Sequence, residues 1–316
     1  GWNHIVLGPW SHNQWLRPKG DSLGPLGFGS NTADHFRGNI LRPWFAHYLH
    51  GTGSGPFPEA WAFEGGANQW HTLEAWPPKA AQPRNLYLRA NGKLSFDAPT
   101  AAAANQPPAA TGDASHTSQF DAFVSDPAHP VPYLPRPDDG NGWSTWLVQD
   151  QRFVHNRPDV VSWVSDPLEA DLTIAGDVVA HLFASTTGSD ADWVVKLIDV
   201  YPDSVADNPA LGGYQLMVNA DIMRGRYWKG FERATPIVPN AVTPFTVQLN
   251  QQFHRFKRGH RLMVQVQSSW FPLYDRNPQT FVENIFRAKA SDFTAQVHRV
   301  WHTARHPSHV EVRVMP

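Results

Sequence analysis

The stretch that decides most of the fold is RLMVQVQSS, residues 261–269. Apolar residues at 262, 264 and 266 alternate with Met or Gln, the period of two that turns one face of a β-strand toward a core. Strand-like segments separated by Asp, Gly, Pro and Asn recur from about residue 119 to the end of the sequence, without a strong helical period. They include VVSWV (160–164), DWVVKLIDVY (192–201) and HVEVRV (309–314). This spacing predicts a β-sandwich of the jelly-roll kind.

One convincing helix precedes these strands. Residues 33–49 carry apolar side chains three to five positions apart, as one face of a helix requires. Asn31 and Thr32 can cap its start, and Gly51 marks its end. Pro43 lies inside the segment and predicts a kink or a split.

A boundary follows the helix. Residues 61–78 contain a short strand and a Trp-rich segment that ends in two prolines. Next, LYLRANGKLSF (86–96) places two strands around an Asn-Gly pair, which is typical of a tight hairpin. The Ala- and Pro-rich residues 99–112 predict a flexible excursion. We therefore divide the chain into residues 1–78, with α/β character, and residues 79–316, which are all-β.

Composition excludes several classes of partner and site. The chain has 316 residues and a formal net charge of -2, so it lacks the basic footprint expected of proteins that bind nucleic acid or anionic membranes. Cysteine is absent, which excludes disulfides and thiolate ligands or nucleophiles. No apolar run approaches the roughly 20 residues of a membrane helix. We expect a soluble protein without nucleic-acid or membrane partners.

The stretch HIVLGPWSHNQW, residues 4–15, carries the strongest functional signal. A short apolar strand at 5–7 is stopped by Gly8-Pro9, and His12 follows in a loop. Open α/β sheets place their chemistry at such strand ends. On these residues alone, a histidine that caps the strand and bonds a backbone carbonyl is the commoner case.

Several longer motifs point to a family. They are GPWSH (8–12), FVSDPAHPVP (123–132), DQRFVHNRPDVVSWVSDPLE (150–169), DWVVKLIDVYPD (192–203), GHRLMVQVQSSWFPLYDRNP (259–278) and HPSHVEV (306–312). In this order they resemble the C-terminal half of the peptidase family that contains X-Pro dipeptidyl-peptidase, cocaine esterase, glutaryl-cephalosporin acylase and the α-amino acid ester hydrolases. In detail, the motifs are most similar to those of the α-amino acid ester hydrolases. The resemblance implies the C-terminal end of an α/β-hydrolase domain in residues 1–78, followed by a jelly-roll β-sandwich in residues 79–316.

The resemblance also implies a Ser-His-Asp triad and an acyl-enzyme, without cofactor or metal. It places the triad histidine at His12, which would accept the serine proton and pass it to the leaving group. Because the triad of α/β-hydrolases runs serine, acid, histidine along the chain, we expect the serine and aspartate upstream of Gly1. The chain is then part of a longer protein and inactive alone. Without the missing hydrolase portion, an apolar face that includes Trp44 and Phe45 should be exposed.

Substrate, assembly and location follow from the same resemblance. It implies a small ester or amide substrate, such as an α-amino acid ester or a β-lactam side chain, and leaves open whether the protein is an esterase, an acylase or a peptidase. Trp10, Trp143 and Trp146 are candidate pocket residues, with packing between domains as the alternative for the last two. A homo-oligomer and a periplasmic or secreted location are implied, and a cytoplasmic location stays open.

Three weaker signals favour structure over chemistry. Ser22 lies in GDSLG, which matches G-x-S-x-G, but no apolar strand precedes it and no helix follows, as a nucleophile elbow requires. His302, His306 and His309 have the residue type for a metal site, yet a proline separates them and a turn into the last strand is the better interpretation. Asp190 and Asp192 could gather calcium, but a solvated turn is favoured.

Two alternatives remain. Tyr274-Asp275-Arg276 predicts an ion pair at the interface between the sandwich and the hydrolase domain, with a wall of the substrate pocket as the other interpretation. For the whole chain, the competing class is a carbohydrate-binding or interaction β-sandwich without catalysis, in which Trp-rich loops hold the ligand. A degenerate scaffold subunit is a third class. The enzyme interpretation predicts that replacing His12 strongly reduces ester hydrolysis. The module interpretation predicts that the same substitution has no effect.

Overall fold

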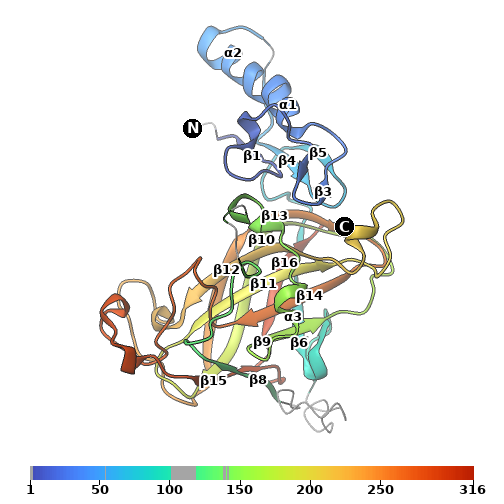
Figure 1. The fold of residues 1–316 in the computed structure, drawn as a ribbon. Coiled ribbons are helices and arrows are strands. Elements are labelled where there is room, and N and C mark those ends of the chain that lie inside the picture. The colour runs from blue at the N-terminus through green and yellow to red at the C-terminus, as the bar shows by residue number, and fades with distance from the viewer. Residues whose placement is uncertain (1–2, 54, 101–118, 138–139, 141) are drawn as a thin grey trace.

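The computed structural model describes residues 3–53, 55–100, 119–137, 140 and 142–316. A small N-terminal body stands on a large β-sandwich (Figure 1). In the small body, β1 (Ile5–Leu7) pairs in parallel with β4 (Ala60–Glu64), which pairs antiparallel with β5 (Gln69–Leu73). A hairpin of β2 (Ser22–Leu23) and β3 (Leu26–Gly27) and the 3-10 turn η1 (Gln14–Leu16) complete it.

The predicted helix is present and is interrupted as expected. It comprises α1 (Thr32–His35), a π-helical segment η2 (Phe36–Leu41) and α2 (Arg42–His50). The Asn31 side chain caps the start by accepting a hydrogen bond from the Asp34 backbone N–H, and Gly51 ends the helix with a φ of 63°. Pro43 lies in the first turn of α2, where its missing N–H costs least, and the wider π-helical turn comes directly before it.

Helix α2 projects from the small body into solvent (Figure 1). Phe45, Tyr48 and Leu49 are exposed, which confirms the predicted apolar face at Phe45. Trp44 departs from the prediction: it is half-buried, because its ring packs on those of Phe45 and Tyr48. The helix thus keeps an uncovered apolar side.

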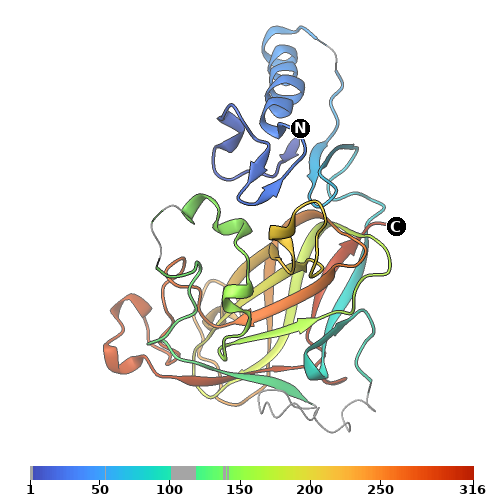
Figure 2. The same ribbon diagram turned by 45° about the vertical axis from the view of Figure 1, so that its right-hand side comes forward.

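Among the described residues, eleven strands form the sandwich, whose arrangement is seen in Figure 2. Its strands are β6 (Gln82–Arg89), β7 (Lys93–Ser95), β8 (Phe120–Ser125), β9 (Val160–Val164), β10 (Leu172–Thr186), β11 (Asp192–Val200), β12 (Gln215–Arg224), β13 (Thr243–Phe256), β14 (Arg261–Gln267), β15 (Gln296–Trp301) and β16 (His309–Val314). They hydrogen-bond in the order β12-β11-β14-β9-β7-β6-β16-β10-β15-β8, and β13 pairs with β10. This network folds over into two layers around one core.

Short helical turns lie in the connections of the sandwich. They are η3 (Ala90–Gly92), η5 (Gly142–Ser144), η6 (Trp146–Val148), α3 (Arg152–His155), η7 (Pro209–Leu211), η8 (Gly225–Tyr227), η9 (Ile285–Arg287) and η10 (Ala290–Asp292). The predicted hairpin of residues 86–96 is confirmed, with η3 between its strands and Asn91 at a φ of 63°. The expected excursion at 99–112 falls almost entirely outside the described residues and stays a prediction, as does the division at residue 78.

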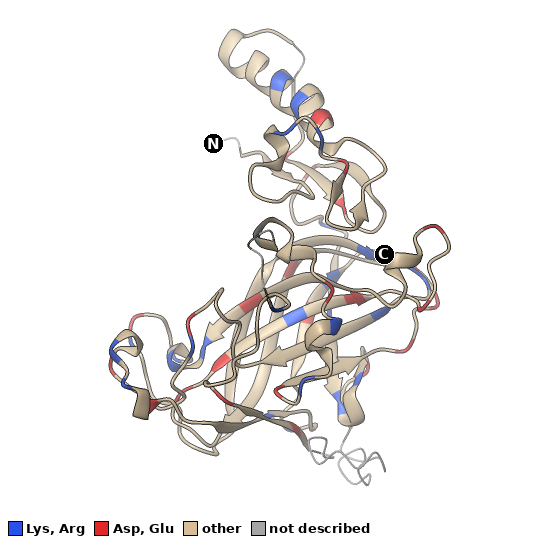
Figure 3. Cartoon of the chain, viewed as in Figure 1, with Lys and Arg blue, Asp and Glu red and all other residues tan. Residues whose placement is uncertain are grey.

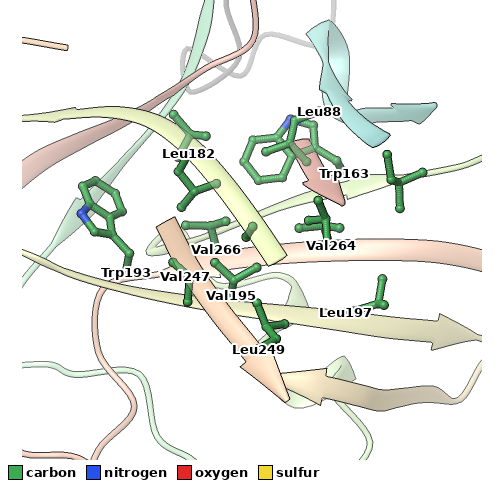
Figure 4. Packing of buried hydrophobic residues seen from close by; sticks show 14 of the residues in the cluster. Leu88, Trp163, Leu182, Trp193, Val195, Leu197, Val247, Leu249, Val264 and Val266 are labelled. Atoms are coloured by element: carbon green, nitrogen blue, oxygen red, sulfur yellow. The ribbon is translucent and has the colours of Figure 1, made fainter. Parts of the chain in front are cut away.

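The alternation of β14 is confirmed in the core. Leu262, Val264 and Val266 are buried in one cluster that also contains Trp163 and Trp193 (Figure 4). Met263 and Gln265 between them and Gln267 after them are buried as well, so the opposite face of the strand is also covered. Both faces of β14 are therefore enclosed.

A charged clamp joins the two bodies. Glu64, at the end of β4, is 1% exposed and accepts two hydrogen bonds from the Arg255 guanidinium, Nε at 2.9 Å and Nη2 at 3.1 Å. Its carboxylate also accepts from Thr173 Oγ1 and contacts His71 Nε2, each at 2.9 Å. Gly66 packs closely against the Arg255 backbone in the same contact. A side chain does not fit at this position, because a Cβ there would lie 2.1 Å from the Arg255 carbonyl oxygen. Strand β4 is thereby fixed to β10 and β13.

Charged residues of both signs are interspersed over the two bodies (Figure 3). This distribution agrees with the small formal net charge. Among the described residues, the helices are all too short or too polar to span a membrane.

A lysine side chain is fully buried in the sandwich. Lys196 on β11 has no exposed surface, its Nζ donates to Gln151 Oε1 at 2.8 Å, and it lies 5.2 Å from the centroid of the Trp270 ring. Burial lowers the pKa of this ammonium to about 7.

Replacing Lys196 with methionine should flatten the pH dependence of stability. An unfolded lysine keeps its proton up to a pKa of about 10.4. The unfolded state therefore binds more protons above pH 7, and the wild-type free energy of unfolding should rise by about 2 kcal/mol from pH 7 to pH 9 through this group. Urea unfolding at pH 7 and at pH 9 measures this change in the free energy of unfolding. The exposed Lys79→Met is the control and should keep the wild-type slope; equal slopes in all three proteins would contradict the prediction.

Candidate active site

His12 lies on an exposed turn directly after β1. The strand ends at Leu7, residues 11–13 turn, and η1 begins at Gln14. Asn13 adopts a left-handed backbone conformation with a φ of 61°, which reverses the chain. The imidazole therefore sits at the carboxyl end of a parallel-paired strand, as the sequence predicted.

Trp10 anchors this turn from its N-terminal side. Its Nε1 donates to Thr32 Oγ1 at 2.9 Å, and that hydroxyl donates to the Gly20 carbonyl oxygen at 2.5 Å. The indole packs against three aromatic rings, those of Trp15, Phe36 and Trp70. Gly8 is required beside it, because a Cβ would come within 2.3 Å of the indole ring.

Gln14 holds the other side of the turn. Its Oε1 accepts from the Ser11 backbone N–H at 3.1 Å, and its Nε2 donates to the Ser22 carbonyl oxygen at 2.8 Å. Ser22 itself is exposed in the two-residue strand β2, which turns into β3 and not into a helix. The surroundings of Ser22 confirm that it does not sit in a nucleophile elbow.

A cavity of about 760 Å³ lies between the two bodies. Phe28 and Phe63 of the small body and Tyr201 of the sandwich line it. Trp146 is also in its wall, with its ring 5.6 Å from that of Trp270 in an edge-to-face contact. The cavity thus combines aromatic walls from both bodies.

Trp10 is not among the residues that line this cavity. Trp10 lines a second cavity of about 580 Å³, together with Phe36 and Phe253. The side chain of Trp143 lies outside the described part of the structure. Pro9 lines both cavities, so the strand end before His12 borders each of them.

A buried Asp-His-His cluster also borders the large cavity, and the sequence analysis did not find it. Asp199 contacts His254 Nε2 at 2.9 Å through Oδ2 and His260 Nδ1 at 2.7 Å through Oδ1. Burial raises the pKa of Asp199, but the hydrogen bonds from the two imidazoles outweigh it and leave the pKa lowered. The cluster links β11 to β13 and to the turn before β14. Asp199 lies 55 and 61 residues from the two histidines, so no local pattern marks the cluster.

Comparisons with known proteins identify the family of the chain. The model of the X-Pro dipeptidyl-peptidase C-terminal non-catalytic domain matches residues 56–311. The chain belongs to this family.

Similar proteins extend the match over the whole chain. A solved aminopeptidase from the marine sediment archaeon Thaumarchaeota archaeon is 47% identical, with a TM-score of 0.91 over 99% of this chain and 49% of its own. A selenomethionine-labelled α-amino acid ester hydrolase is 47% identical, with a TM-score of 0.89 over 99% of this chain and 50% of its own. Cocaine esterase from Rhodococcus sp. (strain MB1 Bresler) is 27% identical over 98% of this chain and 51% of its own length.

The chain therefore spans about half the length of these relatives. The resemblance predicted from the motifs, to the C-terminal portion of the family, is confirmed. His12 lies before residues 56–311, the part that matches the non-catalytic domain.

The predicted ion pair of Asp275 has a different partner in the structure. Asp275 pairs with Arg224 and not with its neighbour Arg276, whose Nη1 instead donates to the Pro127 carbonyl oxygen at 2.8 Å. Tyr274 borders the large cavity, as the pocket interpretation expected.

The acidic turn is neither a calcium site nor solvated. Asp190 and Asp192 are both buried; the first pairs with Arg226 Nη2 at 2.7 Å, and the second accepts from Asn277 Nδ2 at 2.8 Å. Burial raises the pKa of Asp192 to about 7. The Arg226 guanidinium compensates the charge of Asp190 inside the fold. We therefore assign the turn a structural role.

The C-terminal histidines form a turn, as predicted. His302 bridges to Pro307, and His309 Nδ1 contacts the Pro307 carbonyl oxygen at 2.8 Å as β16 begins. Over the described residues, no three side chains of the His, Cys, Asp or Glu type gather as metal ligands would.

Proposed function

We propose that this chain is the C-terminal half of a serine hydrolase that cleaves esters or amides through an acyl-enzyme. One observation carries the proposal: His12 is exposed at the end of β1 in a chain that is 47% identical to an α-amino acid ester hydrolase over 99% of its length. In this proposal residues 1–78 close an α/β-hydrolase domain, and the sandwich has jelly-roll topology.

His12 supplies proton transfer in this scheme. It takes the proton from a serine hydroxyl and gives it to the leaving group of the ester or amide, and it then activates the water that releases the acyl group. The serine and the aspartate belong to polypeptide upstream of Gly1. That polypeptide also covers the exposed side of α2 and the edge of β1 opposite β4.

The aromatic cavity supports the proposed substrate class. Trp146, with Trp143 three residues earlier in the sequence, would form part of the wall for an acyl group, and α-amino acid esters or β-lactam side chains are the candidates. The aminopeptidase relative supports aminoacyl amides as a second kind of substrate. A homo-oligomer and a periplasmic or secreted location complete the proposal.

The full-length protein should hydrolyse alanine methyl ester or alanine p-nitroanilide, and residues 1–316 alone should not. The reason is that the nucleophile and its oxyanion donors are supplied upstream. Turnover assays and labelling by a fluorophosphonate probe, run on both proteins, measure this. Labelling and turnover restricted to the full-length protein support the proposal. A folded full-length protein that is neither labelled nor active contradicts it, and turnover by residues 1–316 alone contradicts the upstream nucleophile.

A further inference from the structure

We propose that Thr32 is a positioning residue for His12 and acts through Trp10. The inference rests on the proposed role of His12 and adds a residue that touches neither the substrate nor the imidazole. Its basis is a relay of hydrogen bonds that ends two residues before His12.

The relay runs through one hydroxyl group. Trp10 Nε1 donates to Thr32 Oγ1, and the same oxygen carries a hydrogen that it donates to the Gly20 carbonyl. The Thr32 backbone N–H also donates to that carbonyl, at 3.0 Å. Thr32 has no exposed surface, so water cannot replace its hydroxyl as the partner of the indole.

The position of Thr32 is itself fixed. It is the first residue of α1, and the Asn31 side chain caps that helix while accepting from the Gly20 backbone N–H at 3.0 Å. A Cβ at Gly20 would meet Ala33 at 2.6 Å, so the loop and the helix are in close contact. The helix start and residue 20 therefore form a rigid base for the indole.

Rigidity is transmitted to His12 over a short path. One residue separates Trp10 from His12, and only glycine fits at position 8 because the indole lies directly over it. A general base must stay within about 2.6–3.2 Å of the proton that it moves. Displacement of about 1 Å costs roughly 100-fold in rate. If the Trp10 indole lost its hydrogen bond and moved, the turn that carries His12 would shift by a fraction of about 1 Å.

Thr32→Val tests the role, and Thr32→Ser is its rescue. Valine has the shape of threonine without the hydroxyl, whereas serine keeps both hydrogen bonds. In the full-length protein, with alanine methyl ester as substrate, Thr32→Val should lower kcat about tenfold and leave KM within about twofold, since the lost contact serves the transition state. The pH at half-maximal kcat should stay unchanged. Thr32→Ser should stay within about twofold of wild type in kcat.

Thr173→Val is the matched control. It removes a hydroxyl that donates to the Glu64 carboxylate at 2.9 Å in the clamp between the bodies, far from the relay in sequence. It should lower the thermal midpoint without lowering kcat at a temperature where all variants are folded. Hydrogen exchange at residues 11–16 should speed up in Thr32→Val and not in Thr173→Val, a readout that does not depend on catalysis.

The outcomes separate the inference from the proposed function. The inference holds if Thr32→Val alone loses kcat and protection at residues 11–16. It falls if Thr32→Val keeps wild-type kcat while His12→Ala is inactive, or if Thr32→Ser loses as much as Thr32→Val. If His12→Ala keeps full activity, the proposed function falls first and takes the inference with it.

Discussion

Replacing His12 with alanine in the full-length protein should lower kcat/KM for an α-amino acid ester by at least about a thousandfold. Without an imidazole, the serine hydroxyl stays protonated near neutral pH and the leaving group departs without a proton. The loss should appear in kcat, because His12 acts on the reacting proton and not on substrate binding. Steady-state hydrolysis of alanine methyl ester measures it. The fold should be unaffected, since His12 is exposed on its turn.

His50→Ala is the matched control for this variant. His50 is also exposed and lies on the same small body, in the last turn of α2. Its activity should stay within about twofold of wild type. If His12→Ala keeps more than about a tenth of wild-type activity, the general-base role is wrong. A polysaccharide that raises the melting temperature would then favour the carbohydrate-binding module, whereas lack of fluorophosphonate labelling would favour a scaffold.

Local sequence patterns predicted the elements that local physics controls. The alternation at 262, 264 and 266 identified the core face of β14, and Asn31, Pro43 and Gly51 identified where the helix begins, breaks and ends. Each of these signals depends on the chain within a few residues of itself. The strand before His12 was predictable for the same reason.

Contacts between distant segments were beyond this kind of prediction. The pairing of Asp275 with Arg224 depends on how β12 lies beside the segment after β14, and neighbouring residues in the sequence suggested Arg276 instead. The contact of Asp199 with two histidines joins β11 to β13, with which it does not pair, and to the turn before β14. The anchoring of Trp10 was missed because its partner Thr32 looked like a helix cap, although the residue type fits both uses.

The clamp at Glu64 was missed on the same grounds, and it gives the largest expected effect on stability. Arg255 lies 191 residues away in sequence, yet its guanidinium binds the Glu64 carboxylate in a two-pronged contact. Because Glu64 is 1% exposed, its charge is tolerated only while these partners surround it. The clamp fixes the body that carries His12 on the sandwich.

Glu64→Gln should therefore lower the free energy of unfolding by about 3 kcal/mol, the cost typical of breaking a buried ion pair from one side. The amide keeps the size of the side chain, but it loses the charge and turns one acceptor into a donor that faces the donors of Arg255 and Thr173. Urea unfolding followed by tryptophan fluorescence measures the change. Glu74→Gln makes the same substitution at an exposed position just after β5 and should change stability by less than about 0.5 kcal/mol. If both variants unfold at the wild-type urea midpoint, the contact between Glu64 and Arg255 does not hold the small body in place, and the packing of Gly66 against β13 must do so instead.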